Sequence, residues 1–376
     1  MRIAMSCAGE GFGHVSRMIS FAQGLQARHE LVLFAPKSVQ HHIRRSLPQA
    51  KVITIPYFHL TKKDDRILYF DTVRQNLAKF IRFRVDVRAI RRQLHKQRVQ
   101  AVVSDYEPYL PAAARALDLP VLQVNHPAVV LQYPSASPDA LIASAVARLM
   151  MGRYDRRLYV SFYNGDVGPI LRSEFSSSRV ERGDYYVVYV KPTYRRRVAA
   201  ELERLGVSNY RMFPNPNLNY AEALAGCKGV ITGAGHQSLS EAVTLGKPVF
   251  AIPQRGQYEQ RLNARMLVAS GWGMKGRFSN LGKTLPTFIA SIDSFPQLPH
   301  LPRSPHVPHV PQASLSAAEY QDPHGNRFRF VNDRELAVQY IENFVKEYAG
   351  TGVVQRFIMH VQANMQHTLQ ALGLAG

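Results

Sequence analysis

Cysteine is scarce in this chain of 376 residues, which contains only Cys7 and Cys227. Cys7 lies in an apolar run, and Cys227 lies in a stretch with helical character. Two thiols so far apart in the sequence make neither a disulfide framework nor a zinc site. The sequence therefore predicts a protein of a reduced, cytoplasmic setting.

Long hydrophobic runs are also missing. The most membrane-like stretch, residues 140–151, is interrupted by Arg148 and is too short to span a bilayer. The apolar start of the chain leads directly into a glycine loop without a separate cleavage region, so we expect no secretory leader. Hydrophobic residues nevertheless make up 46% of the sequence, which predicts a sizeable packed core.

Acidic residues are few, with 27 Asp and Glu against 47 Lys and Arg, so the formal net charge is +20. Such an excess favours an anionic partner: an acidic membrane surface, a nucleic acid or a phosphorylated substrate. The charge does not choose among these, and some basic proteins have no such partner. We expect a cytoplasmic protein, with peripheral attachment to the inner face of the membrane as an option. Nothing in the sequence indicates an obligate protein partner.

Short apolar runs alternate with helical patterns along most of the chain. This alternation is typical of βαβ units with parallel sheets, whose buried strands are continuously apolar. The sequence therefore predicts an α/β protein with two Rossmann-like, doubly wound domains that face each other across a cleft. The expected strands are 3–8, 31–35, 52–55, 99–104 and 121–124 in the first domain, and 185–190, 210–213, 229–232 and 248–252 in the second.

We place the domain boundaries at stretches that are rich in glycine, serine or proline. We expect a first domain over residues 1–167, a linker region over 168–184 and a second domain over 185–348. Prolines recur every third residue within 295–311, which suits a polyproline II surface loop. The tail is predicted to be helical, with a break at 350–352 and a C-terminal helix within 349–376.

The first motif, GEGFGH at residues 9–14, follows the first strand and opens a helix. Its glycines allow a tight turn, and the helix N-terminus offers free N–H groups to an anion. The glycine spacing does not match the dinucleotide fingerprint, and Pro36 and Lys37 follow the second strand where that fingerprint needs an acid. The motif therefore disfavours a nicotinamide enzyme.

The second motif, SDYEP at residues 104–108, ends another strand of the same sheet. The carboxyl ends of parallel strands share one edge, so His14 and either Asp105 or Glu107 can meet there. A histidine oriented by a carboxylate is a common general base near neutral pH. An alternative of equal weight is that Asp105 caps the next turn and His14 only supports the glycine loop.

Two further motifs lie in the second domain. In VITGAGHQSLSEA, residues 230–242, a glycine turn leads into a helix whose first amides and Ser238 hydroxyl suit a phosphate. A capping box between Ser238 and Glu241 is the alternative, but it does not explain two glycines and a histidine before the cap. In PQRGQYEQRLNA, residues 253–264, amides and a carboxylate supply the donors and acceptors that sugar hydroxyls need.

Taken together, the four motifs resemble those of the GT-B glycosyltransferases. The chain is similar to the branch with the enzyme that adds N-acetylglucosamine to the lipid-linked peptidoglycan precursor, and to the nucleotide-diphosphosugar glucosyltransferases of plants. The resemblance covers roughly residues 1–275 and is most specific over 230–273, where Gly-x-x-Ser-x-x-Glu-Ala, Gly-Lys-Pro and Glu-Gln-x-x-Asn-Ala occur in order. The sequence departs from the plant pattern at Gly233, where a histidine is usual, and at Glu259, which is often an amide or aspartate.

The resemblance implies a glycosyltransferase that needs no metal ion or other cofactor and uses a nucleotide-diphosphate sugar, with a UDP-sugar as the first expectation. A single displacement with one base and no carboxylate nucleophile predicts inversion at the anomeric carbon. His14 would be the base and Asp105 its orienting partner, with Glu107 in reserve. Glu241 would bind the ribose, and Glu259 with Gln260 would bind the donor sugar. The full set of implied donor-binding residues is Gly13, Gly233, Gly235, His236, Gln237, Ser238, Glu241, Gln257, Glu259 and Gln260.

The acceptor depends on the basic segment 74–98, whose pattern predicts an amphipathic helix. Phe80, Phe83, Val87, Ile90 and Leu94 form its apolar stripe. Arg84, Arg88 and Arg91 form an adjoining stripe that we expect to bind an anionic acceptor or surface. We favour a lipid-linked or envelope acceptor at a membrane over DNA with hydroxylated bases. A nonenzymatic nucleotide-sugar- or nucleic-acid-binding protein is the third alternative.

Overall fold

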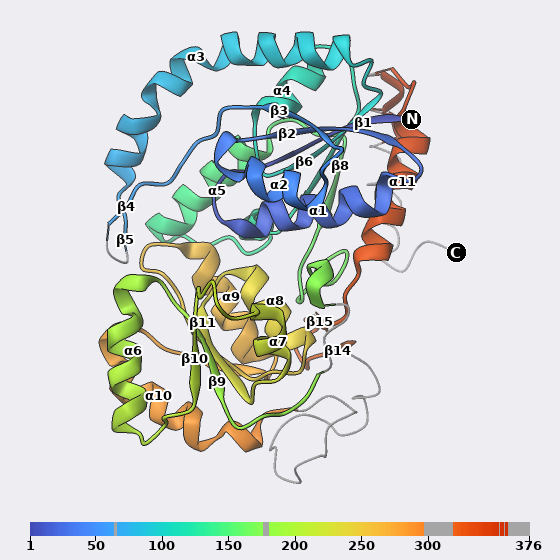
Figure 1. Cartoon of the computed structure of the whole chain (residues 1–376). Helices are drawn as coiled ribbons and strands as arrows, with labels where there is room; N and C mark the ends of the chain where they lie inside the picture. Colours follow the sequence, from blue (N-terminus) through green and yellow to red (C-terminus); the bar gives the residue numbers. More distant parts are fainter. Residues whose placement is uncertain (64–65, 176–179, 297–318, 353, 357, 360–376) are drawn as a thin grey trace.

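A computed structural model describes residues 1–63, 66–175, 180–296, 319–352, 354–356 and 358–359. It contains two parallel sheets, each covered by helices on both faces, as the sequence predicts (Figure 1). None of the helices within these described ranges is long and apolar enough to cross a membrane.

The first sheet has six strands in the order β3-β2-β1-β6-β7-β8. Its strands are β1 (Arg2–Cys7), β2 (Glu30–Ala35), β3 (Lys51–Thr54), β6 (Ala101–Asp105), β7 (Val121–Asn125) and β8 (Arg156–Tyr159). Its helices are α1 (Phe12–Leu25), α2 (Gln40–Ser46), α3 (Tyr69–Lys96), α4 (Tyr109–Arg115) and α5 (Pro138–Met151). The edge strand β8 was not predicted, because it begins with two arginines and has no continuous apolar run.

The second sheet has five strands in the order β10-β9-β11-β12-β13. Its strands are β9 (Tyr186–Tyr189), β10 (Tyr210–Phe213), β11 (Gly229–Gly233), β12 (Val249–Ile252) and β13 (Gly273–Lys275). Its helices are α6 (Pro192–Arg204), α7 (Tyr220–Ala225), α8 (His236–Thr244), α9 (Tyr258–Ala269) and α10 (Leu281–Ala290). Two small antiparallel hairpins complete the strands: β4 (Lys62–Lys63) with β5 (Arg66–Ile67), and β14 (Glu319–Gln321) with β15 (Arg327–Arg329).

Alternate residues of each buried strand point to opposite faces of the sheet and pack into two separate cores. In β1, Ile3 and Met5 pack toward α1, while Ala4 packs toward α3 and α4. In β9, Val188 faces α6 and α10, and Val187 faces α7, α8 and α9. We call the part of the chain around the first sheet the first half and the part around the second sheet the second half. The core that contains Val187 also includes Phe162 from the first half, so the two halves share buried apolar contacts.

The final described helix, α11 (Arg334–Tyr348), returns to the first half of the chain (Figure 1). Ile341 and Phe344 are buried in the core that covers one face of the first sheet. This differs from the predicted boundary, which placed residues up to 348 in the second domain. The pattern of α11 reveals that one face is apolar, but not which sheet that face covers.

Other predicted boundaries fall partly outside the described residues. These are the linker residues 176–179, the proline-rich residues 297–311 and the C-terminal residues 360–376. The first helix begins at Phe12, so Gly13 and His14 belong to its first turn.

Candidate active site

Two chain segments that carry the predicted catalytic residues meet where the strand order of the first sheet reverses. Strands β1 and β6 are parallel neighbours, with Cys7 paired to Asp105. The backbone N–H of Ala8 donates to the carbonyl of Asp105 at 2.9 Å, which brings the glycine loop against the end of β6. Ligands of open α/β sheets bind at such a switch point.

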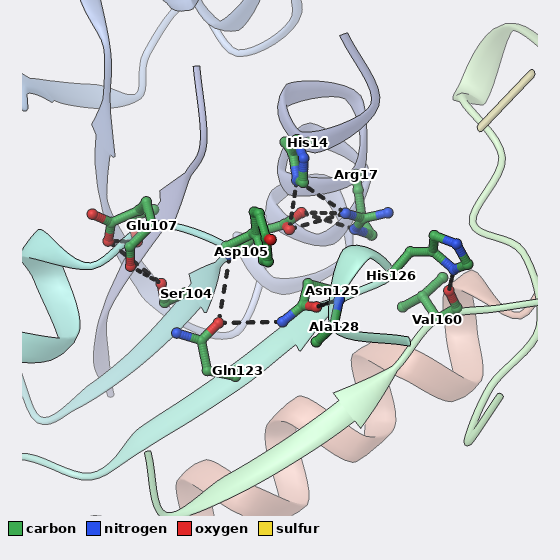
Figure 2. A network of polar contacts seen from close by, with 12 residues as sticks. His14, Arg17, Ser104, Asp105, Glu107, Gln123, Asn125, His126, Ala128 and Val160 are labelled. Carbon is green, nitrogen blue, oxygen red and sulfur yellow. Dashed lines mark hydrogen bonds and ion pairs between the residues drawn. The ribbon is translucent and has the colours of Figure 1, made fainter. Parts of the chain in front are cut away.

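His14 and Asp105 are in direct contact, as predicted (Figure 2). Nδ1 of His14 lies 2.8 Å from Oδ1 of Asp105. Burial by itself would raise the pKa of Asp105, but the charges of Arg17 and His14 and their hydrogen bonds hold it below its ordinary value. Asp105 is therefore a carboxylate at neutral pH and accepts a hydrogen bond from Nδ1 of His14. This arrangement leaves Nε2 of His14 as the atom that can take a proton.

Arg17 is a third member of this cluster, and the sequence analysis did not identify it. Its Nε donates to Oδ2 of Asp105 at 2.8 Å, and its Nη2 donates to Oδ1 at 2.9 Å. Arg17 lies three residues after His14, so both side chains share one face of α1. That spacing is the signal that could have found it. The arginine is only 3% exposed and needs an anion in contact, which Asp105 provides.

Glu107 is not an alternative base, which corrects the prediction that kept it in reserve. Its carboxylate is turned toward Ser104 and away from the His14 cluster (Figure 2). It accepts bonds from the Ser6 hydroxyl at 2.6 Å and from the backbone N–H of Tyr109 and Leu110. These contacts cap the first turn of α4. Burial raises the pKa of Glu107 to about 7.

A pocket of about 320 Å³ opens at the equivalent switch point of the second sheet, between the ends of β9 and β11. Four predicted donor-binding residues line it: Gly233, Gly235, Ser238 and Gln260. A Cβ atom on Gly235 would meet no other atom within 4 Å, so a ligand has room at the first turn of α8. Volumes of this size are usual for sites that hold small ligands.

The pocket also contains residues that the sequence analysis did not select. Lys191 follows β9 and brings a positive charge to the wall, and Tyr194 stacks on Phe278 with ring centres 3.6 Å apart. Gln254 is 5% exposed, and its Nε2 has no hydrogen-bond partner among the described residues. A buried amide donor left unpaired in a pocket wall can bond to a ligand oxygen.

Three predicted donor-binding residues face the first half of the chain instead of the pocket. Glu241 is 2% exposed and accepts a two-pronged contact from Arg172, with Nε at 2.8 Å. Gln237 donates to the carbonyl of Ile170 and to Glu241. His236 stacks on His126 with ring centres 3.5 Å apart, and burial lowers its pKa well below the ordinary value.

The helical period of α8 explains why Gln237 and Glu241 face away from the pocket, contrary to the prediction. Gln237 and Glu241 lie four residues apart and share one face of the helix, which contacts the segment around Ile170 and Arg172. Ser238 lies on the turn that faces the pocket. A motif in the sequence cannot show which face of α8 the linker covers.

The remaining predicted donor-binding residues, Gln257, Glu259 and Gly13, do not line the pocket. Gln257 is the N-cap residue of α9, and its Oε1 is buried with no partner in the described part of the chain. Glu259 lies close enough to Tyr106 for its charge, after burial, to raise the pKa of that phenol. The Tyr106 ring in turn stacks on His14 at 5.9 Å. A Cβ on Gly13 would lie 3.4 Å from Cβ of Gln237, so the glycine loop faces α8.

The arginines of the predicted anionic-surface site, Arg84, Arg88 and Arg91, are all exposed on α3. Figure 1 shows α3 as an outer helix of the first half, whereas the pocket is lined by residues of the second half. Donor-side and acceptor-side candidates are therefore carried by different halves of the chain.

Comparison with known families identifies a family of glycosyltransferases. The family described as glycosyl transferase family 1 matches residues 1–293 of this chain. An uncharacterized glycosyltransferase of Methanopyrus kandleri is 25% identical over 275 residues, which cover 62% of this chain and 79% of that protein.

Solved structures of glycosyltransferases share the fold. MurG of Acinetobacter baumannii has a TM-score of 0.52 at 14% identity and covers 77% of this chain and 90% of its own. The glycosyltransferase of kitacinnamycin has a TM-score of 0.52 at 15% identity and covers 96% of this chain and 98% of its own. The calicheamicin glycosyltransferase CalG4 has a TM-score of 0.52 at 16% identity, with coverages of 78% and 90%.

Proposed function

This chain belongs to glycosyl transferase family 1, and from that premise we propose that it transfers a sugar from a UDP-sugar to a hydroxyl group with inversion at the anomeric carbon. The observation that carries the proposal is the His14–Asp105 contact on one half, with a ligand-sized pocket on the other. The acceptor is an anionic or membrane-associated molecule, because Arg84, Arg88 and Arg91 are exposed on the half that holds His14.

His14 is the general base of this reaction. As the acceptor oxygen bonds to the anomeric carbon, its proton passes to Nε2 of His14, and the bond between that carbon and the diphosphate oxygen breaks. Asp105 holds Nδ1 and stabilises the imidazolium that forms. Asp105 is itself held by Arg17 and is not available as a nucleophile. One displacement with one base inverts the anomeric carbon.

The second half binds the donor. The first turn of α8, at Gly235 and Ser238, offers amides and a positive helix end to the diphosphate. Lys191 adds a positive charge to the same wall. These groups stabilise the leaving diphosphate, so we propose that the reaction needs no metal ion. Gln254 and Gln260 bond the sugar hydroxyls, and Glu259 approaches the sugar from the side of Tyr106.

The test is a transfer assay with UDP-sugars and a hydroxyl acceptor, with and without a chelator. We expect transfer in both conditions and a product whose anomeric configuration, read from NMR coupling constants, is opposite to that of the donor. Retained configuration would overturn the single-displacement mechanism. Loss of transfer with the chelator, restored by a divalent metal, would overturn the metal-independent one.

A further inference from the structure

The first half of α3 exposes a row of large apolar side chains to solvent. These residues are between 42% and 80% exposed. Their three- and four-residue spacing places them on one face of the helix. The residues are Phe70, Val73, Leu77, Phe80, Ile81 and Val85. We call this row the apolar ridge.

The apolar ridge shares only Phe80 with the apolar stripe that the sequence predicted, and the Phe80 ring also stacks on Phe58 with ring centres 4.6 Å apart. Ile90 and Leu94 of the predicted stripe are buried, and Phe83 and Val87 pack against the same core. The helix therefore has an inner apolar face toward the sheet and, in its first half, an outer one. A contiguous exposed row of this kind is uncommon on a soluble surface and marks an interaction site.

The outward face changes from apolar to cationic along the helix. Arg84, Arg88 and Arg91 continue the line of Leu77 and Ile81 at helical spacing, and all three arginines are exposed. Over its 28 residues, α3 is about 42 Å long at 1.5 Å per residue. The two chemistries therefore lie side by side on one extended surface, which forms the outer edge of the first half (Figure 1).

We propose that this outward face of α3 docks on an anionic lipid surface. The apolar ridge enters the boundary between headgroups and acyl chains, and the arginines contact lipid phosphates. Duplex DNA would match the arginines but would offer nothing to the apolar ridge. In an antiparallel pair, a second copy of the chain would place the apolar ridge against the arginines. A lipid surface matches both halves of the face at once.

Docking in this way places the glycine loop close to the lipid surface. The loop that precedes α3 is bonded to the inner side of this helix, since Nδ2 of Asn76 donates to the carbonyl of His59 at 2.8 Å. The same loop binds the glycine motif, because the N–H of Leu60 donates to Oε1 of Glu10 at 2.7 Å. Glu10 lies four residues before His14. A lipid-borne acceptor would thus present its hydroxyl near the base, a consequence that rests on the proposed function.

The test is co-sedimentation of the full chain with phosphatidylglycerol or phosphatidylcholine vesicles, without donor or acceptor. We expect strong binding to the anionic vesicles only. The variant Leu77→Ser/Ile81→Ser should bind about tenfold or more weakly, because two inserted side chains are lost. The matched control is Val268→Ser/Leu336→Ser, which removes two exposed apolar side chains from α9 and α11 and should bind like the wild type. Thermal unfolding of both variants verifies that they fold.

A second variant, Arg84→Gln/Arg88→Gln/Arg91→Gln, should weaken binding and flatten its salt dependence. The proposal fails if the wild type does not bind anionic vesicles, or if the Leu77 and Ile81 variant binds them like the control. It also fails if the chain prefers duplex DNA, or if the apolar ridge substitutions only turn a dimer into a monomer in sedimentation. Because no donor is present, these outcomes leave the transfer reaction untouched. If vesicle binding is intact but no sugar is transferred, only the proposed transferase function is overturned.

Discussion

Asp105 is shared between Arg17 and His14, and this sharing orients the candidate base. Arg17 contacts both carboxylate oxygens, and His14 contacts one of them. Asp105 is 4% exposed and ionised, so it can orient His14 and stabilise its protonated form without changing its own charge. Arg17 supplies the positive charge that stabilises this buried carboxylate.

Substitution at this cluster should separate the base from its orienting partner. His14→Ala should lower turnover by about 10²–10⁴-fold, as expected for loss of a general base, with donor affinity unchanged. Asp105→Asn should cost less, because the imidazole remains. Steady-state kinetics and calorimetry of donor binding measure both effects. A larger loss at Asp105 than at His14, or weakened donor binding in His14→Ala, would contradict the assignment.

Glu107 should make the free energy of unfolding depend on pH. Burial raises its pKa from 4.5 to about 7 in the folded chain. Between these values the folded chain holds a proton that the unfolded chain has released, so stability falls as the pH rises through this window. The cost at pH 8 is on the order of 3 kcal/mol. Glu107→Gln, which cannot ionise, should therefore gain stability relative to the wild type from pH 4.5 to 7.

Urea unfolding at several pH values tests this expectation. The exposed residue Glu335 on α11 provides the control, since Glu335→Gln should show no such trend. A difference between Glu107→Gln and the wild type that stays constant over the window would show that Glu107 is not protonated in the folded chain.

At the scale of elements, α11 lies near the end of the described chain and completes the core of the first half. Its buried face contacts α1 closely, and a Cβ on Gly24 would lie 2.7 Å from a methyl group of Val338. Asp333, just before the helix, accepts a bond from the N–H of Gly168 at 2.6 Å. The two ends of the second half are thus both attached to the first.

Truncation of Ile341 should test how much α11 stabilises the first half. Ile341→Ala removes a fully buried side chain and should lower the free energy of unfolding by about 2–5 kcal/mol. Leu336→Ala changes an exposed residue of the same helix and should stay within about 0.5 kcal/mol of the wild type. Denaturant titration measures both. Equal effects of the two substitutions would mean that α11 is not part of this core.

At the scale of the whole molecule, polar contacts join the two halves beside the candidate site. His126 of the first half contacts Oδ1 of Asn263 in the second at 2.9 Å, and the Tyr163 hydroxyl donates to the same oxygen at 3.0 Å. Nδ2 of Asn263 donates to the carbonyl of Ala234, next to the pocket. Asn263 is fully buried, so these bonds are shielded from water.

Asn263→Leu should weaken the coupling between the halves. It leaves His126 and Tyr163 buried without this acceptor, which costs about 1–3 kcal/mol for each unsatisfied group. We expect a lower unfolding midpoint by circular dichroism and a less cooperative transition. The control, Asn217→Leu, changes an exposed residue of the second half and should leave the transition intact. An unchanged midpoint in Asn263→Leu would show that these bonds do not hold the halves together.

Local patterns were enough to predict much of this architecture. Continuous apolar runs indicate buried parallel strands wherever they occur, so both sheets could be predicted before their pairing was known. A glycine loop after β1 and an acid at the end of β6 place His14 and Asp105 at one sheet edge, because parallel strands end on the same side. The same reasoning located Gly235 and Ser238 at the pocket.

Only the tertiary structure decided which polar side chains remain available to a ligand. Glu107 and Glu241 occur in motifs of the same kind as the site residues, yet the first caps α4 and the second binds Arg172. The position of α11 on the first half, and the outer apolar ridge of α3, also depend on which surfaces meet. A periodic pattern shows that a helix has an apolar face, whereas the partner of that face is set by contacts between residues far apart in the chain.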